Sequence, residues 1–217
     1  MKNLISSLLI ILLTLTLSAC ANEESTQIEQ NTSLEAFSDP LENHRNDATQ
    51  FAEIFPVSEN NPFIFASFDE VVALLESGTG VLAFGFPECP HCHNAFPILE
   101  QAFVEMDISS YEGFLGRILY YNPREDREEN NERYQILISY LSEYLIEDEY
   151  GNPRLYVPDV YFISSGRITG NHSGTVPDML NSTDPFYEQQ VAELKDIYMS
   201  LIVGMFLYEN QMGNCCP

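Results

Sequence analysis

The sequence predicts an α/β domain with a central mixed β-sheet and helices on both faces. Between residues 63 and 147, short apolar runs alternate with amphipathic helical patterns, which is typical of parallel strands joined by crossover helices. Two further strand patterns, at 159–163 and 167–171, are separated by a Ser-Ser-Gly turn and predict an antiparallel hairpin. Hydrophobic residues make up 45% of the 217 residues, which is enough for one core.

The first part of the domain pattern contains two strands and two helices. Residues 63–66 form a short apolar run after Asn-Pro and predict the first strand. Ser67 and Glu70 form a capping box that predicts the start of a helix. The run 81–86 is continuously apolar, as expected for a central strand buried on both faces, and a helical pattern follows from 93 to 106.

The second part of the pattern continues the alternation. We expect a strand at 116–121, a charged loop at 123–131 and an amphipathic helix at 133–147, in which apolar residues recur every three or four positions. After the hairpin, residues 185–207 predict the last long helix. The sequence shows no internal repeat.

The N-terminus has the pattern of an export signal. Lys2 precedes an apolar, leucine-rich stretch at 4–17, which is too short for a comfortable membrane span. The stretch ends in Leu-Ser-Ala-Cys, and this motif resembles the lipobox of bacterial lipoproteins. The resemblance implies a signal peptide at 1–19 and a lipid on Cys20, which would anchor the protein on the extracytoplasmic side of the cell membrane. The alternative is an ordinary signal peptide cleaved near Ala19 or Ala21, with an incidental cysteine.

Composition divides the remaining chain into three parts. Residues 20–48 are polar and show no sustained period, which predicts a lipid-anchored flexible tether. The folded domain is expected at 49–210. Residues 211–217 form a tail that contains Cys215 and Cys216.

The charge balance is strongly acidic and restricts the possible partners. The chain has 33 Asp and Glu against 9 Lys and Arg, a formal net charge of −24. Such a surface repels nucleic-acid phosphates, so nucleic acid is excluded as a partner. The acidity fits solubility outside the cell, and a basic partner is the alternative.

The cysteines point to redox or metal chemistry at one close pair. Cys89-Pro90-His91-Cys92 lies directly between the apolar strand 81–86 and the following helix. A cysteine at a helix N-terminus has its thiolate stabilised by unpaired backbone N–H groups and the helix dipole. One close pair does not make a structural disulfide framework, so it indicates a redox dithiol or a metal site.

The segment around this pair resembles a known superfamily. Residues 84–99 are similar to the active-site strand and helix of the thioredoxin superfamily, and Pro97 stands where that family has its helix-kinking proline. Val157-Pro158, followed by a strand and a glycine turn, resembles the family's cis-proline loop. Within the superfamily, the chain resembles extracytoplasmic thioredoxin-like lipoproteins of Gram-positive bacteria, a group that includes bacteriocin-transport accessory proteins.

The resemblance implies a role for each residue of the site. Cys89 would be the nucleophile and Cys92 the resolving thiol. Pro158 would be cis and would face the dithiol, while Val157 and Pro90 would contact an extended substrate segment. The alternative is a trans proline that merely begins an edge strand.

Residues beside the dithiol leave the direction of electron flow open. The Pro-His dipeptide resembles that of periplasmic disulfide-forming oxidases, and His91 in that position would favour the thiolate and a more oxidising disulfide. A merely exposed His91 is the alternative. Glu88 disfavours the thiolate. Ala83 occupies the position where thioredoxins have a buried aspartate, which leaves the proton acceptor of Cys92 unidentified.

Haem, zinc and an auxiliary thiol pair are the competing interpretations of these residues. The motif continues to His93 as C-x-x-C-H, which is also a haem-attachment pattern, but the apolar strand and Pro97 favour a thioredoxin-like site with His93 exposed. The tail cysteines and the dithiol could together bind zinc, although adjacent cysteines suit a zinc site poorly. The tail pair could instead exchange with the dithiol. We expect neither a metal nor another cofactor.

Two further segments lie near the predicted site. Asp159 directly follows the proline loop, and we expect it to be a strand-edge residue rather than a catalytic acid. Tyr120 and Tyr121, with the charged residues 124–127, could shape a substrate groove, but a solvated charged loop is the favoured interpretation.

Two functions from different classes follow from these observations. The first is a thiol–disulfide oxidoreductase that acts on thiols or disulfides of exported proteins and is recycled by a redox partner. The second is a thioredoxin-fold accessory or binding protein for an exporter or a secreted peptide. An intact dithiol favours the enzyme, because a pure binding module has no need of it. A monomer is expected.

Overall fold

The computed structural model describes residues 40–107, 114, 116–177 and 184–213. The predicted signal peptide 1–19, the lipidation site Cys20 and the tail cysteines Cys215 and Cys216 lie outside the described residues. In this part of the chain, no helix is both long and apolar enough to cross a membrane.

The described elements alternate between strands and helices along the chain. The strands are β1 Phe63–Phe65, β2 Gly80–Phe84, β3 Ile118–Tyr121, β4 Ile146–Glu147, β5 Pro153–Arg154, β6 Asp159–Ser164 and β7 Arg167–Ser173. The helices are α2 Pro40–Ile54, α3 Phe68–Ser77, α4 Pro90–Glu105, α5 Arg124–Glu129, α6 Glu132–Leu141 and α7 Glu188–Gly213.

The main sheet has five strands in the order β1-β3-β2-β6-β7. The strand β3 pairs in parallel with both β1 and β2, whereas β6 pairs antiparallel with β2 and with β7. This mixed sheet, with helices on both faces, is the thioredoxin-like α/β fold, and it confirms the predicted fold class. The small second sheet joins β4 and β5.

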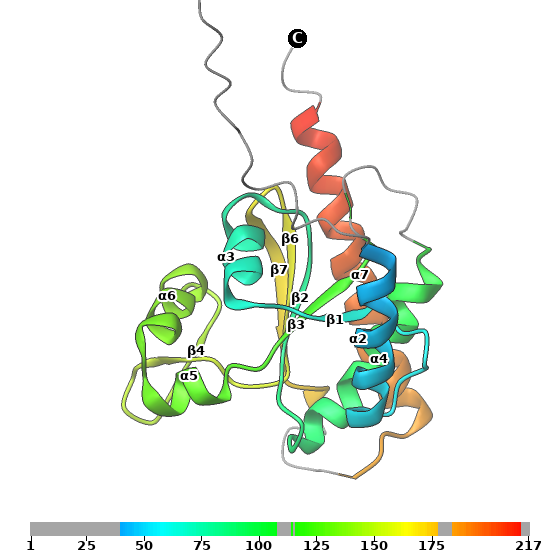
Figure 1. Cartoon of the computed structure of the whole chain (residues 1–217), viewed down its shortest axis with the longest axis horizontal. Helices are drawn as coiled ribbons and strands as arrows, with labels where there is room; N and C mark the ends of the chain where they lie inside the picture. The colour runs from blue at the N-terminus through cyan, green and yellow to red at the C-terminus, as the bar shows by residue number, and fades with distance from the viewer. Residues whose placement is uncertain (1–39, 108–113, 115, 178–183, 214–217) are drawn as a thin grey trace, which may run out of the picture. The chain divides into compact units, whose positions relative to one another are not determined.

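Two cores form because successive residues of the central strands point to opposite faces of the sheet. In β2, Val81 and Ala83 belong to one core, and Leu82 and Phe84 belong to the other. The helices α2, α4 and α7 cover the first face, and α3 and α6 cover the second (Figure 1). Since β2, β3 and β6 are buried on both faces, they appear in the sequence as continuous apolar runs.

Local sequence signals set the start of α3 and the turn of the β6–β7 hairpin. Ser67 accepts a hydrogen bond from the Glu70 backbone N–H while the Glu70 carboxylate accepts from Ser67, so the predicted capping box is confirmed. Gly166 has φ +74°, and a Cβ there would lie 2.2 Å from the Glu76 carbonyl oxygen. Only glycine fits this turn.

The helix α2 begins earlier than the sequence analysis expects. We predicted a flexible tether up to residue 48, but α2 starts at Pro40. Ala48 and Phe51 are buried, and Phe51 stacks on Phe63 of β1 with ring centroids 4.2 Å apart. Residues 40–50 are mostly polar, so their composition resembles that of a linker, although Ala48 and Phe51 are buried.

The predicted helix 133–147 ends at Leu141, six residues early. The backbone N–H of Tyr144 closes a turn on the Leu141 carbonyl, and the Tyr144 hydroxyl donates to the Ile168 carbonyl 3.3 Å away. Ile146 then pairs with Arg154 in the β4–β5 hairpin. The apolar period therefore continues past the helix because these side chains pack in a turn and a hairpin.

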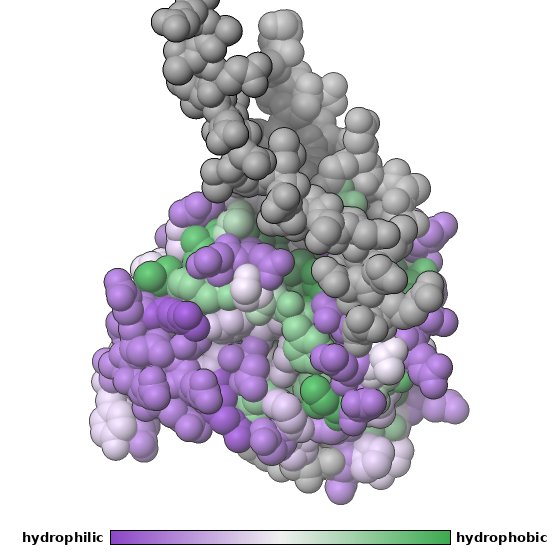
Figure 2. All heavy atoms as spheres, viewed as in Figure 1, coloured by the Kyte–Doolittle hydropathy of each residue, from purple (hydrophilic) through white to green (hydrophobic). Residues whose placement is uncertain are grey.

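The visible surface is mostly hydrophilic. In Figure 2 the hydrophobic areas on this side are small and separated by hydrophilic residues. This agrees with the large excess of acidic residues in the chain.

Candidate active site

The dithiol lies where β2 gives way to α4. Cys89 is the N-cap of α4, Pro90 occupies the first turn and is exposed, and the Cys89 sulfur accepts a hydrogen bond from the Cys92 backbone N–H at 3.2 Å. Proline suits this turn because the first N–H groups of a helix have no intrahelical partner. Both thiols are free and buried. The structure thus places the predicted nucleophile and resolving cysteine one helical turn apart.

Gly85 allows the loop before the dithiol to pass close to the core. A Cβ at this position would lie 2.6 Å from Cζ of Phe96 and 3.2 Å from the Cys92 sulfur. Glycine is therefore required by space at this point, and its lack of a side chain lets the dithiol approach the end of β2.

The two thiols have opposite shifts of acidity. The pKa of Cys89 is lowered, chiefly by the hydrogen bond from the Cys92 thiol, and burial opposes this. The backbone N–H groups of Cys92 and His91 and the charge of Arg124 lower the pKa of Cys89 further. Burial raises the pKa of Cys92 far above its ordinary value, and the hydrogen bond to Cys89 adds to the increase. Cys89 is thus the thiol that ionises first and can attack.

The Val157–Pro158 peptide bond is cis, as the sequence predicts. It lies directly before β6, and the Val157 carbonyl oxygen is 3.6 Å from the Cys89 sulfur. The predicted proline loop therefore faces the dithiol. An extended segment that reacts with Cys89 would pass alongside the backbone of Val157.

His91 follows Pro90 in the first turn of α4 and lines a groove. Its backbone N–H helps to lower the pKa of Cys89, whereas its Nδ1 is buried without a hydrogen-bond partner among the described residues. The groove has a volume of about 350 Å³. Its lining residues come from α4, the β4–β5 hairpin region, the proline loop and the end of β7: His91, Ile146, Tyr156, Val157, Ser173, Gly174 and Thr175.

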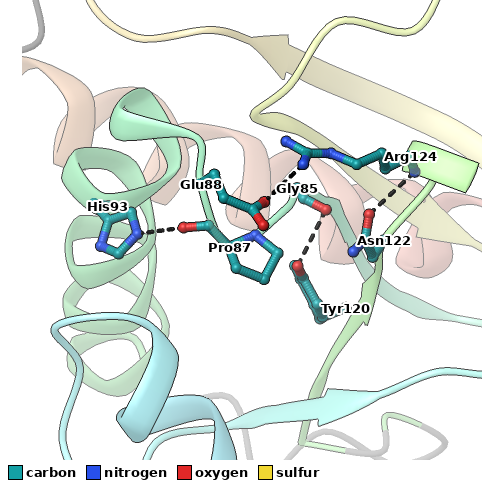
Figure 3. Close-up of polar contacts among 7 residues, drawn as sticks. All are labelled: Gly85, Pro87, Glu88, His93, Tyr120, Asn122 and Arg124. Carbon is teal, nitrogen blue, oxygen red and sulfur yellow. Dashed lines mark hydrogen bonds and ion pairs between the residues drawn. The ribbon is translucent and has the colours of Figure 1, made fainter. Parts of the chain in front are cut away.

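His93 is not the exposed residue that the sequence analysis expects. Its Nε2 lies 2.6 Å from the Pro87 carbonyl oxygen, and its ring is 5.0 Å from that of Phe55. Figure 3 shows His93 reaching from α4 toward this loop. The nitrogen that a haem iron would need is therefore occupied by a backbone contact, and His93 holds the loop before the dithiol.

Two residues from β3 and α5 hold the same loop from its other side. The Tyr120 hydroxyl donates to the Gly85 carbonyl at 3.1 Å, and Arg124 Nη1 lies 3.1 Å from the Glu88 carboxylate (Figure 3). Burial raises the pKa of Tyr120, and the charges of Cys92 and Cys89 raise it further. Tyr120 is thus a neutral hydrogen-bond donor close to both thiols.

The predicted charged loop 123–131 is largely the helix α5. Arg124 and Arg127 lie over the Phe86 ring, at 4.2 and 5.4 Å from its centroid. Asp126 is buried and accepts a hydrogen bond from the Tyr121 hydroxyl. The interpretation as a solvated loop is therefore wrong. The sequence signal that could have indicated the contact is the Arg-x-x-Arg spacing directly after a strand that ends near the dithiol.

Asp159 is a buried residue of β6 and not a residue of the strand's exposed edge. Its side chain is 1% exposed and accepts hydrogen bonds from the Tyr161 hydroxyl at 2.7 Å and from Asn171 Nδ2 at 3.4 Å. Burial raises its pKa to about 7. Asp159 bonds to Tyr161, which belongs to the core on the face of the sheet opposite that of Cys92. Asp159 therefore does not take the place of the buried aspartate that thioredoxins have at the position of Ala83.

A metal site is not formed by the described residues. Among them, no three His, Cys, Asp or Glu side chains are grouped so that they could hold an ion. The zinc interpretation also involves Cys215 and Cys216, which lie outside the described residues.

Comparison with known proteins gives a match at the level of folds only. No family model and no curated protein matches the chain. Thioredoxin O2 from Arabidopsis thaliana is similar, with 16% identity and a TM-score of 0.36 over 65% of this chain and 96% of that one. A thioredoxin from Aeropyrum pernix gives 21% identity and a TM-score of 0.31 over 62% and 86%.

Because both TM-scores are low, the fold assignment depends on the strand order and the pairing directions of the sheet. The molecule is a thioredoxin-fold protein with a free dithiol at the start of α4. The chemistry that such an arrangement can perform is thiol–disulfide exchange.

Proposed function

We propose that the protein is a thiol–disulfide oxidoreductase of the extracytoplasmic side of the membrane, acting on exported proteins. The observation that supports this most is the pair of free, buried thiols at the N-terminus of α4, where the Cys89 sulfur accepts a hydrogen bond from the Cys92 backbone N–H at 3.2 Å. The pKa of Cys89 is lowered there and that of Cys92 is raised. A stabilised thiolate beside a buried, protonated thiol is the arrangement that a two-step disulfide exchange needs.

In the reducing direction, the Cys89 thiolate attacks one sulfur of a substrate disulfide. A mixed disulfide forms and the other substrate sulfur leaves as a thiolate. Cys92 then loses its proton and attacks the Cys89 sulfur, which releases the second substrate thiol and leaves the Cys89–Cys92 disulfide. Two electrons pass to the substrate, and the reverse sequence oxidises a substrate dithiol.

The substrate segment would lie in the groove between the proline loop and the β4–β5 hairpin. Its backbone would run beside Val157, and Pro90 is exposed at the rim of the dithiol. Ile146 and Tyr156 offer exposed apolar surface there, with 56% and 40% of each residue accessible. This surface favours a substrate with an apolar side chain near its reactive cysteine.

The location is proposed from the sequence. The apolar stretch 4–17 and the Leu-Ser-Ala-Cys motif support export and lipid attachment at Cys20, as in the Gram-positive lipoproteins that the chain resembles. A Cys20→Ala variant should no longer incorporate a labelled fatty acid, while unchanged incorporation would contradict lipid attachment at Cys20. A role as an accessory or binding protein for an exporter or a secreted peptide is the alternative, and it would not require the dithiol.

The function is tested by trapping the first intermediate. A Cys92→Ser variant, incubated with a disulfide-containing peptide, should accumulate a mixed disulfide at Cys89 because no resolving thiol is present. The matched Cys89→Ser variant should accumulate none at Cys92, since that thiol is buried and has a raised pKa. Peptide mass spectrometry identifies the modified cysteine, and adducts at Cys92 alone would refute the proposed roles.

A further inference from the structure

We propose that Arg124 is a positioning residue of the dithiol. It is held on Phe86 and Glu88 so that its positive charge stabilises the Cys89 thiolate, and Glu88 limits this effect. The inference rests on the proposed function, because it assigns the residue that tunes the attacking thiol. It concerns a residue of α5, outside the C-x-x-C motif and the proline loop.

Two contacts fix the Arg124 side chain beside the dithiol, and a third fixes its backbone. Its guanidinium lies 4.2 Å from the centroid of the Phe86 ring, and its Nη1 lies 3.1 Å from Glu88 Oε2. The backbone N–H of Arg124 donates to the Asn122 side chain at 3.0 Å, which fixes the start of α5 (Figure 3). Phe86 and Glu88 both belong to the short loop that leads into Cys89, so the cation is tied to the loop that carries the nucleophile.

The charges around Cys89 determine how strongly the Arg124 cation stabilises the Cys89 thiolate. The chain has only 9 Lys and Arg against 33 acidic residues. Arg127 also lies over the Phe86 ring, at 5.4 Å, but Arg124 is closer to it and is the cation that pairs with Glu88. The charge of Arg124 lowers the pKa of Cys89 and also that of Tyr120. Glu88 lies immediately before Cys89 and pairs with the same guanidinium. The pair therefore acts with opposite signs on one thiolate.

The contact is partly open to solvent, so its effect is moderate and depends on salt. The side chains of Arg124 and Glu88 are 34% and 65% exposed, and exposed charges are screened by water and ions. Stacking on Phe86 compensates by holding the guanidinium in one place, because a planar cation packs well on an aromatic face.

The test is a titration of the Cys89 thiolate in the reduced, full-length chain. Cys20, Cys215 and Cys216 are replaced by serine so that only the dithiol contributes to the ultraviolet absorbance of the thiolate. Arg124→Gln should move the midpoint to higher pH, and Glu88→Gln should move it to lower pH.

A rate measurement gives the same information at one pH. Below the midpoint, Arg124→Gln should slow alkylation of Cys89 by about threefold at low salt, as expected for a partly exposed charge. The difference should shrink at high salt.

Two further variants separate charge from structure. Arg124→Lys keeps the charge and should recover most of the wild-type midpoint. Arg167→Gln is the matched control, because Arg167 also lies over an aromatic ring, that of Tyr208, but pairs with Ser164 at the end of β6 away from the proline loop. It should leave the midpoint unchanged.

An Arg124→Gln midpoint equal to that of Arg167→Gln would overturn the inference, and so would an Arg124→Lys midpoint equal to that of Arg124→Gln. Failure of the proposed function is distinguishable from both outcomes. It would appear as a dithiol that forms no reversible disulfide with glutathione, whereas the thiolate titration needs only the reduced protein.

Discussion

The buried carboxyl of Asp159 gives a prediction about stability that can be worked out from the structure. The group is 1% exposed, and its pKa of about 7 is raised from an ordinary 3.8 by burial. The folded protein therefore holds this proton more tightly than the unfolded chain does. The resulting stabilisation is fully present below pH 4 and is lost as the pH rises toward 7.

The magnitude follows from the two pKa values. The difference between about 7 and 3.8, at about 1.4 kcal/mol per pKa unit, gives an upper limit of about 4 kcal/mol for the change between pH 4 and pH 8. An Asp159→Asn variant keeps an oxygen that can accept from the Tyr161 hydroxyl, and its amide does not titrate. The variant should therefore lack this part of the pH dependence and become relatively more stable at high pH.

The assay is urea unfolding of the reduced wild-type and Asp159→Asn proteins at intervals from pH 4 to pH 8. The free energy of unfolding of the wild type minus that of the variant should fall steadily as the pH rises, by about 2 to 4 kcal/mol in total. All other titrating groups are shared, so they cancel in this difference. A difference that is constant with pH, or that rises, would refute the assignment of a buried, protonated carboxyl beside the proline loop.

Three further predictions concern the dithiol and its groove. Gly85→Ala should lower the free energy of unfolding by about 1 to 3 kcal/mol, since its Cβ would lie 2.6 Å from Phe96; unchanged urea unfolding would contradict the tight loop. Iodoacetamide at neutral pH should modify Cys89 well before Cys92, because the pKa of Cys89 is lowered and that of Cys92 is raised; mass spectrometry showing the reverse order would exclude Cys89 as nucleophile. Ile146→Asp should slow exchange with an apolar disulfide peptide several-fold and leave exchange with glutathione unchanged; equal effects on both would exclude the groove as a peptide site.

The central strands of the sheet could be predicted from the sequence because a strand that is buried on both faces is an uninterrupted run of apolar residues. The run 81–86 is apolar without interruption, and the structure buries β2 completely. The capping box of α3 is a local signal of the same kind. In both cases the pattern lies within a few consecutive residues, so the element can be predicted without knowing which distant residues it contacts.

The elements that the sequence analysis missed depend on distant partners. The helix α2 has few apolar residues, and its place is set by Phe51, which stacks on Phe63. The end of α6 is set by the contact of Tyr144 with Ile168 and by the pairing of Ile146 with Arg154. These tertiary contacts override the local helical pattern, and the sequence of each segment alone does not indicate them.

The candidate site divides in the same way. The cysteines and the cis proline could be located from a motif and its resemblance, and the structure brings Val157 to within 3.6 Å of the Cys89 sulfur. The contacts of His93 with Pro87 and of Arg124 with Glu88 could not be located. They depend on how α4 and α5 face one loop, which is a property of the assembled fold.

The central claim is that Cys89 and Cys92 form a reversible two-electron couple, and its most direct test is equilibration of the purified protein with glutathione buffers. With the other three cysteines replaced by serine, we predict one transition between dithiol and disulfide, abolished in both Cys89→Ser and Cys92→Ser. The midpoint then gives the direction of electron flow, since about −120 mV is typical of a disulfide donor and about −270 mV of a reductant. A protein that shows no such transition, or one that persists in Cys89→Ser, would contradict the account.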